Sequence, residues 1–148
     1  MEKIETLWNA LRQVHTLEFV AHSRSNTGWT GKGAGSVIVE SPTPESIVFH
    51  ESGLWHPTAG KNIEFRNIYR WLRSGDTVRL EHLRFGEENS VYLFDLAPDS
   101  DTVWSSVAPH LCRQDEYVAL LEIQESVLSL HWKITGPAKN EEILYRYR

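Results

Sequence analysis

The chain changes its hydrophobic period once, from helical spacing to β spacing, close to residue 16. The early apolar positions recur at helical spacing and predict an amphipathic helix over about residues 3–14. The members of this stripe are Ile4, Leu7, Trp8, Leu11 and Val14. Beyond them, apolar and polar residues alternate with period two between clusters of turn residues. The strands predicted in this way are 16–24, 33–40, 46–55, 62–71, 77–85, 90–96, 116–123, 127–135 and 142–148.

The order of these elements indicates a mainly β fold. Antiparallel strands joined by short turns, without helical crossovers, predict an up-and-down meander. About nine or ten strands predict closure into an antiparallel β-barrel, with the N-terminal α-helix capping one end. Because the sequence has no internal repeat, low-complexity segment or linker, we expect a single domain over residues 1–148.

Composition narrows the class of protein. Of the 148 residues, 41% are hydrophobic and 24% are charged, as in ordinary soluble domains. The apolar runs are too short for a membrane span, and the first residues lack the apolar core of a signal peptide. The single cysteine fits a reducing cytoplasm, so a cytoplasmic location is expected. A net charge of −5 without a basic block disfavours nucleic acid as a partner.

Two fixed-spacing motifs stand near the end of the chain, where strands meet turns. They are His110-x-Cys112-x-x-Asp115-x-Tyr117 and Trp132-x-x-x-Gly136-Pro137-x-Lys139. The first contains a thiol, a base and an orienting acid, which are the ingredients of nucleophilic catalysis. The alternative, which we favour, is a corner lock in which Asp115 accepts backbone N–H groups and the Tyr117 ring packs inward. Paired, closely spaced Cys or His ligands are lacking, so no metal is expected.

The second motif is first of all a hairpin turn, because glycine and proline supply its backbone angles. Lys139 has three possible roles: it stays in solvent, it pairs with Asp115 or Glu141, or it reaches over the barrel mouth to an anionic ligand. Exposed ion pairs contribute little energy, so a structural role needs no ligand.

The last forty residues resemble a known family. The segments PHLCRQDEYVALLEI and LHWKITGPAKNEEILYRY are similar to an uncharacterised family of small lipocalin-like β-barrels, a domain of unknown function. Its overall plan resembles that of the fatty-acid-binding and nitrobindin-like barrels. The resemblance implies a barrel with an interior cavity, and it transfers no activity.

A glycine-rich run precedes the second predicted strand. Gly28, Gly31, Gly33 and Gly35 in GWTGKGAGSV look like a nucleotide-binding loop. Such a loop must lead into a helix, whereas this run leads into a strand. A β-bulge or a tight bend in a closing sheet is therefore predicted.

The middle strands place polar groups among aromatic residues. Glu51 shares a face with Ile47 and Phe49, and Arg79 and Glu81 also share a face. If these faces point inward, the interior suits a ligand with a polar group, because buried charge is costly unless it is paired. If they point outward, they form an ordinary solvated surface.

The first functional hypothesis is a binding protein for a small, mainly apolar ligand with a polar or anionic group, without a cofactor. Arg79, His110 or Lys139 would meet the head group. The candidate ligand-binding residues are Glu51, Tyr69, Trp71, Arg79, His110, Tyr117, Trp132, Lys139 and Tyr145. Two alternatives stay open. One is an enzyme using Cys112 and His110 in the same cavity, and the other is an interaction module with a homodimer interface on an exposed sheet face.

Overall fold

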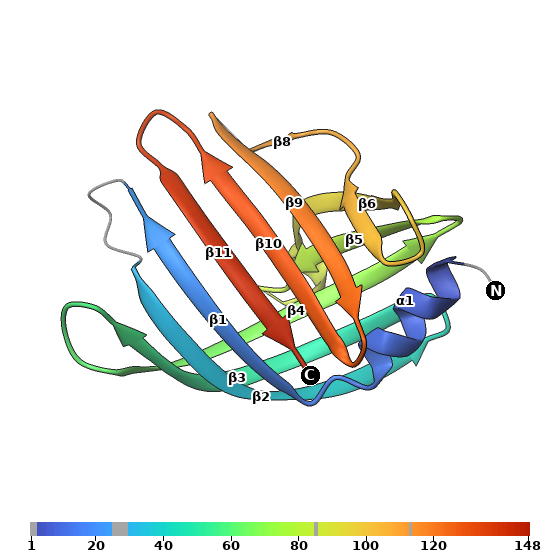
Figure 1. The fold of residues 1–148 in the computed structure, drawn as a ribbon, viewed down its shortest axis with the longest axis horizontal. Coiled ribbons are helices and arrows are strands. Elements are labelled where there is room, and N and C mark those ends of the chain that lie inside the picture. The colour runs from blue at the N-terminus through green and yellow to red at the C-terminus, as the bar shows by residue number, and fades with distance from the viewer. Residues whose placement is uncertain (1–2, 25–29, 85, 113) are drawn as a thin grey trace.

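The computed structural model describes residues 3–24, 30–84, 86–112 and 114–148, in which one α-helix precedes eleven strands (Figure 1). The helix is α1 (Lys3–Arg12). The strands are β1 (Thr16–Ser23), β2 (Gly31–Thr43), β3 (Ser46–Pro57), β4 (Ile63–Ser74), β5 (Thr77–His82), β6 (Val91–Pro98), β7 (Val103–Ser106), β8 (His110–Cys112), β9 (Asp115–Gln124), β10 (Val127–Thr135) and β11 (Asn140–Tyr147). A 3₁₀ turn, η1 (Glu87–Asn89), precedes β6.

The strands close into a barrel of ten antiparallel members. β1 to β7 pair in chain order, β7 pairs with β9, and β9 continues through β10 and β11 back to β1. β8 stands outside this ring, and its pairing within the described ranges is with the first residues of β9. The predicted antiparallel barrel with an N-terminal helix is therefore confirmed.

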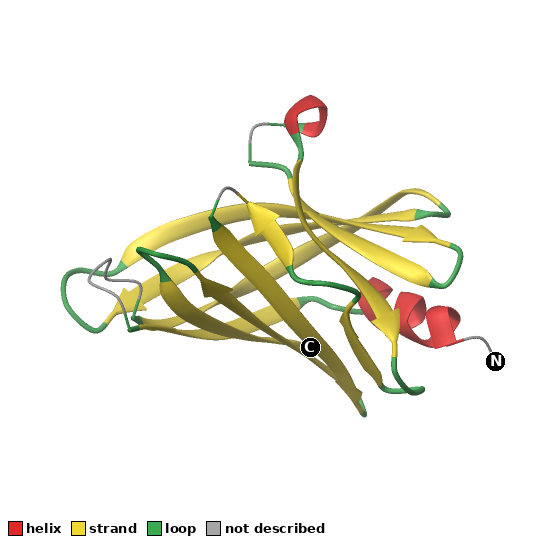
Figure 2. Ribbon diagram, turned by 90° about the horizontal axis from the view of Figure 1, so that it is seen from above, coloured by secondary structure: helices red, strands yellow, loops and turns green. Residues whose placement is uncertain are grey.

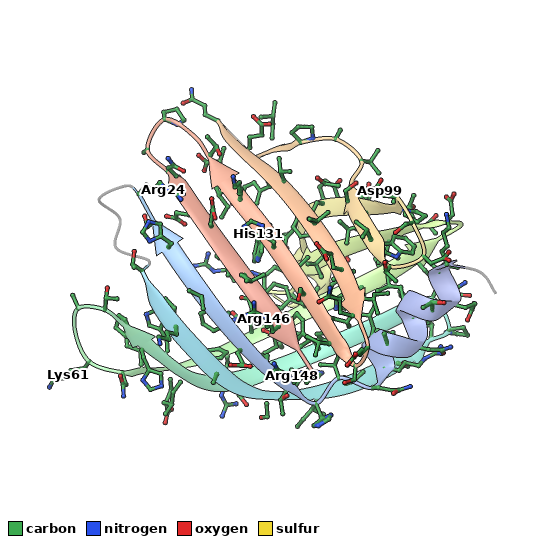
Figure 3. All side chains as sticks on the ribbon, in the orientation of Figure 1. Arg24, Lys61, Asp99, His131, Arg146 and Arg148 are labelled. Atoms are coloured by element: carbon green, nitrogen blue, oxygen red, sulfur yellow. The ribbon has the colours of Figure 1, made fainter. Side chains whose placement is uncertain are left out.

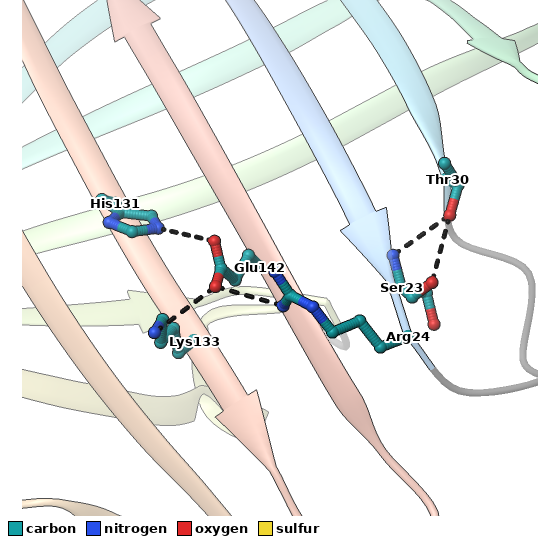
Figure 4. A network of polar contacts seen from close by, with 6 residues as sticks. All are labelled: Ser23, Arg24, Thr30, His131, Lys133 and Glu142. Atoms are coloured by element: carbon teal, nitrogen blue, oxygen red, sulfur yellow. Dashed lines mark hydrogen bonds and ion pairs between the residues drawn. The ribbon is translucent and has the colours of Figure 1, made fainter.

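The period-two pattern sets the inner and outer faces of the wall, as β10 illustrates. Its apolar residues Leu130 and Trp132 are buried, whereas His131 and Lys133 lie on the outer face. There His131 and Lys133 each approach Glu142 of β11 at 3.4 Å (Figure 4). Figure 3 shows further charged side chains over these strands, including Arg146. The alternation predicted for 127–135 is confirmed.

α1 seals one end of the barrel, as Figures 1 and 2 both show. Leu7, Trp8 and Leu11 are fully buried, and the Trp8 indole N–H donates to the carbonyl of Pro44 at 3.2 Å. Arg73 of β4 lies over the Trp8 ring at 5.5 Å from its centroid, and this arginine pairs with Glu5 of α1 at 2.8 Å. No helix in the described part of the chain has the length and apolarity that crossing a membrane requires.

The other end of the barrel, which we call the far end, is formed by the end of β3, the starts of β4 and β9 and the β10–β11 turn. Inner-face side chains are less enclosed here than beside α1. Trp55, Phe65 and Tyr117 are half-buried, whereas Trp71, close to α1, is 1% exposed.

Some local predictions differ from the structure. The helix ends at Arg12 rather than at residue 14, and the sequence pattern missed the short strands β7 and β8. The register of β2 with β1 and β3 is continuous across Gly31–Gly35, so no bulge lies there. The glycines permit close approach instead: a Cβ at Gly33 would lie 2.2 Å from the Phe19 ring. Gly28 and Trp29 lie outside the described residues.

Candidate functional site

A carboxyl group lies in the middle of the barrel interior. Glu51 occupies the inner face of β3, with Val37 of β2 and Asn67 of β4 opposite it on the neighbouring strands. The residue is only 2% exposed. The Tyr147 hydroxyl donates to Glu51 Oε2 at 2.7 Å, while Oε1 is buried without a hydrogen-bond partner among the described residues. One carboxyl oxygen in the centre of the barrel therefore has no partner among the described residues.

Burial controls the ionisation of this carboxyl. Loss of hydration raises the pKa of Glu51 from 4.5 to about 8, although the hydrogen bond from Tyr147 acts in the opposite direction. Burial also raises the pKa of Tyr69, Tyr145 and Tyr147 above the ordinary tyrosine range. These three phenols are neutral near pH 7, so they can donate hydrogen bonds.

Three tyrosines accompany Glu51, and we call the four residues the Glu51 cluster: Glu51, Tyr69, Tyr145 and Tyr147. Tyr145 and Tyr69 share a hydrogen bond between β11 and β4. The rings of Tyr145 and Tyr147 stack at 5.5 Å between centroids, with 5° between their planes. The cluster thus joins β3, β4 and β11 across the interior.

Aromatic rings flank this cluster on both sides. Phe49 makes edge contacts with Trp71 at 5.6 Å and with Tyr147 at 5.3 Å. Tyr145 stacks on Trp132 at 6.2 Å on its other side. Together these rings form a continuous aromatic wall through the interior, with the carboxyl beside it.

Three tryptophans add unused donors. The indole N–H groups of Trp71, Trp104 and Trp132 are buried and have no hydrogen-bond partner among the described residues. Native interiors usually pair such groups, so several together mark an unusual interior. The barrel interior thus combines apolar walls with indole donors and a carboxyl oxygen that have no partner among the described residues.

Six of the nine candidate residues lie on the inner face of the barrel. They are Glu51, Tyr69, Trp71, Tyr117, Trp132 and Tyr145. Tyr117 packs its ring against the core, as the corner-lock interpretation expects.

The structure places Arg79 differently from the predicted ligand-binding position. Its guanidinium points outward and binds Asp95 of β6, with Nε to Oδ1 at 2.9 Å and Nη2 to Oδ2 at 3.3 Å. Glu81 also faces outward, where Arg70 binds its carboxylate at 2.8 Å. Placing Arg79 inside the barrel to meet a head group was therefore wrong.

The two motifs meet at the far end of the barrel. Lys139 Nζ lies 3.5 Å from Asp115 Oδ2, so the structure shows the ion pair among the roles considered for Lys139. A Cβ at Gly136 would lie 2.1 Å from Asp115 Oδ1, which explains the glycine at this position. This contact fastens the start of β9 to the β10–β11 turn.

The thiol hypothesis concerns side chains outside the described set. The backbone of β8 pairs His110 with Tyr117 and Cys112 with Asp115. The side chains of His110 and Cys112 are not among those described, so their suggested chemistry stays a prediction. Among the described residues, no group of three or more His, Cys, Asp or Glu side chains is arranged to hold a metal ion.

Sequence reasoning missed two inner residues, Tyr147 and His82. Tyr147 continues the alternation of Ile143 and Tyr145, so the sequence pattern could have predicted its position on the inner face. His82 stacks on Tyr69 at 4.8 Å, with 22° between the planes. Burial, followed by the nearby charge of Arg84, lowers the pKa of His82 below its ordinary value. No sequence signal distinguished this histidine from the others.

Two surface pockets are present in the described part of the chain. The first, about 210 Å³, lies between the end of α1 and the β9–β10 turn, beside Gln13 and Ser126. The second, about 180 Å³, lies on the outer face over β11, β1 and β2. Neither pocket includes a member of the Glu51 cluster, and side chains fill most of the barrel centre.

Comparison with known proteins gives a family and two distant structural similarities. No curated protein matches the chain. A de novo designed fluorescence-activating β-barrel is 17% identical, with a TM-score of 0.43 over 94% of this chain and 96% of the other. EF1p2_mFAP2b bound to DFHBI is 9% identical, with a TM-score of 0.46 over 95% of each chain. The model of a family of unknown function, DUF6314, matches residues 4–148, and the chain therefore belongs to that family.

Proposed function

We propose that the barrel interior binds a small, mainly apolar ligand that carries a polar group, and that it does so in the cytoplasm. The observation that carries this proposal is Glu51 Oε1, buried beside aromatic rings and without a partner among the described residues. An unpaired buried polar group costs about 1–3 kcal/mol. A ligand that bonds to Oε1 would remove that cost upon binding.

The surroundings of Glu51 support an apolar ligand body. Phe49, Trp71, Tyr145 and Tyr147 offer ring faces and edges within one continuous wall. Small-molecule sites in proteins commonly combine such walls with a few polar groups that fix orientation. A protein that needed only stability would gain more from aliphatic side chains at position 51.

The filled centre constrains how a ligand is accommodated. Phe49 is fully buried and Trp71 is 1% exposed, so a guest must displace aromatic rings rather than enter an open hollow. Aromatic side chains can adopt other rotamers at modest cost when new contacts replace the old ones. Binding is therefore expected to perturb the buried tryptophans directly.

Tryptophan emission during ligand titration tests the proposal. We expect matched aromatic and acyl ligands to shift or quench the emission of the buried tryptophans, and native mass spectrometry to detect the complex. Ala119 lies on the inner face opposite Trp132, and Ala119→Leu adds volume there. This variant should lower affinity by about tenfold, which corresponds to roughly 1.4 kcal/mol.

The neighbouring residue Val118 supplies the control. It lies on the outer face of the same strand and is 40% exposed, so Val118→Leu should leave affinity unchanged. Circular dichroism of both variants checks that the barrel folds. Equal effects of the two substitutions, or no binding by any ligand of the panel, would contradict an interior site.

A further inference from the structure

Resting on the proposed function, we infer that the polar group of the ligand is a cationic ammonium that binds Glu51 Oε1. The ligand class is thus an amphipathic amine with an aromatic or alkyl body. The sequence predicted a polar or anionic group met by Arg79, His110 or Lys139, and the first of these residues lies outside the barrel.

The geometry around Oε1 provides both elements of ammonium recognition. The carboxyl retains one buried oxygen that accepts from no described residue. Ring systems of Phe49, Trp71, Tyr145 and Tyr147 lie in the same part of the interior. Aromatic faces attract ammonium groups through their quadrupoles, and this attraction grows when water is excluded. A carboxylate beside such rings adds a charge-assisted hydrogen bond.

The charged side chains of the inner face also favour a cationic ligand. Of the lysines and arginines on the described strands, only Arg73 lies on the inner face, and it is engaged with α1 through Glu5 and Trp8. Glu141 of β11 is a second carboxyl on the inner face, 8% exposed and near the far end. Buried carboxyls on the inner face favour a positive ligand over a negative one.

Among the side chains that the structure describes, few titratable groups face Glu51 from the surrounding strands. They are Tyr69 from β4 and Tyr145 and Tyr147 from β11, and His82 of β5 stacks behind Tyr69. The tyrosines stay neutral up to high pH, and the lowered pKa of His82 leaves this ring uncharged near pH 7. The carboxyl of Glu51 is then the group in the cluster whose ionisation an ammonium ligand would promote.

The test compares three probes that share one phenylbutyl body: 4-phenylbutylamine, 4-phenylbutanol and 5-phenylpentanoate. Calorimetry and tryptophan emission should rank the amine tightest and the carboxylate weakest. Glu51→Gln should weaken amine binding by about ten- to a hundredfold and change alcohol binding little. Amine affinity should also rise about tenfold from pH 7 to pH 9, because Glu51 ionises over that range. The rise should vanish in Glu51→Gln.

Glu64→Gln is the matched control, because Glu64 is an exposed carboxyl on the outer face of β4. It should leave the affinity of every probe unchanged. If the alcohol binds and the carboxylate binds as tightly as the amine, the inferred ligand class is wrong while the interior site stands. If Glu51→Gln keeps full amine affinity, the same conclusion follows. If no probe binds by either method, the proposed function fails as well.

Discussion

At the scale of the residue, Glu51 stands out because its buried carboxyl has no cationic partner among the residues that the structure describes. The Arg70–Glu81 pair on the outer face shows the usual arrangement, with a guanidinium bound to the carboxylate at 2.8 Å. In the described part of the chain, the Glu51 carboxyl accepts a side-chain hydrogen bond only from the Tyr147 hydroxyl. The free energy of unfolding should therefore depend on whether Glu51 is protonated. Stability is expected to change with pH because of this residue.

We predict that Glu51 makes the protein less stable as pH rises. The folded-state pKa of about 8 lies above the ordinary 4.5, so the folded protein holds this proton more tightly than the unfolded chain. The resulting stabilisation is fully present below pH 4.5 and is lost as pH rises to about 8. The loss approaches roughly 1.4 kcal/mol per pH unit within that window.

Urea unfolding of the wild type and Glu51→Gln at several pH values measures this effect. The difference in free energy of unfolding between the two proteins should decline from acid to mildly alkaline pH. A difference that is constant with pH would show that folding leaves the pKa of Glu51 unchanged, and one that grows as pH rises would show that folding lowers it.

At the scale of the element, the alternation of apolar and polar residues was sufficient to assign the inner face where strands are long and regular. It placed Glu51 on the same face as Ile47 and Phe49, and the structure agrees. In β5, however, Val78 and Leu80 mark the inner face, so Arg79 between them had to point outward. The sequence interpretation grouped Arg79 with Glu81 and left open whether that face points inward.

Other features of the site had weaker signals or none in the sequence. β7 and β8 are four and three residues long, too short to establish a period. The bond from Tyr147 to Glu51 joins residues 96 positions apart, and local pattern cannot specify such a partner. Unpaired indole groups and the stacking of His82 on Tyr69 depend on packing across the barrel, which only the folded structure defines.

Glycine pairing between β2 and β3 gives a prediction at this scale. Gly35 and Gly53 are register partners, and a Cβ at Gly35 would lie 2.0 Å from the backbone oxygen of Ser52. Because backbone rather than a flexible side chain occupies that space, Gly35→Ala should destabilise the barrel by about 1–3 kcal/mol. Ser36→Ala, at the exposed neighbouring position, should change stability by less than about 0.5 kcal/mol in the same thermal or urea unfolding series. Equal stability of the two variants would mean that the strands can separate locally at no cost.

At the scale of the whole molecule, closure of the ring determines how a ligand could reach Glu51. The ring of paired strands closes, although the four-residue strand β7 alone links β6 to β9. At one end, α1 seals the barrel with fully buried side chains such as Leu7 and Trp8. The far end is less enclosed, because Trp55 and Phe65 are only half-buried there. The structure therefore favours the far end as the route to the interior.

We predict that barrel opening at the far end limits the rate of ligand binding. In stopped-flow tryptophan fluorescence, the observed rate should level off at high ligand concentration, and the apparent association rate constant should stay below about 10⁵ M⁻¹ s⁻¹. Asp115→Ala removes the contact with Lys139 that fastens the far end, so it should raise the limiting rate. Leu7→Ala weakens the seal at α1 and should cost about 2–5 kcal/mol of stability while leaving the limiting rate unchanged. The reverse pattern would place the entrance beside α1, and a rate that stays linear in ligand concentration would mean that the interior is accessible without opening.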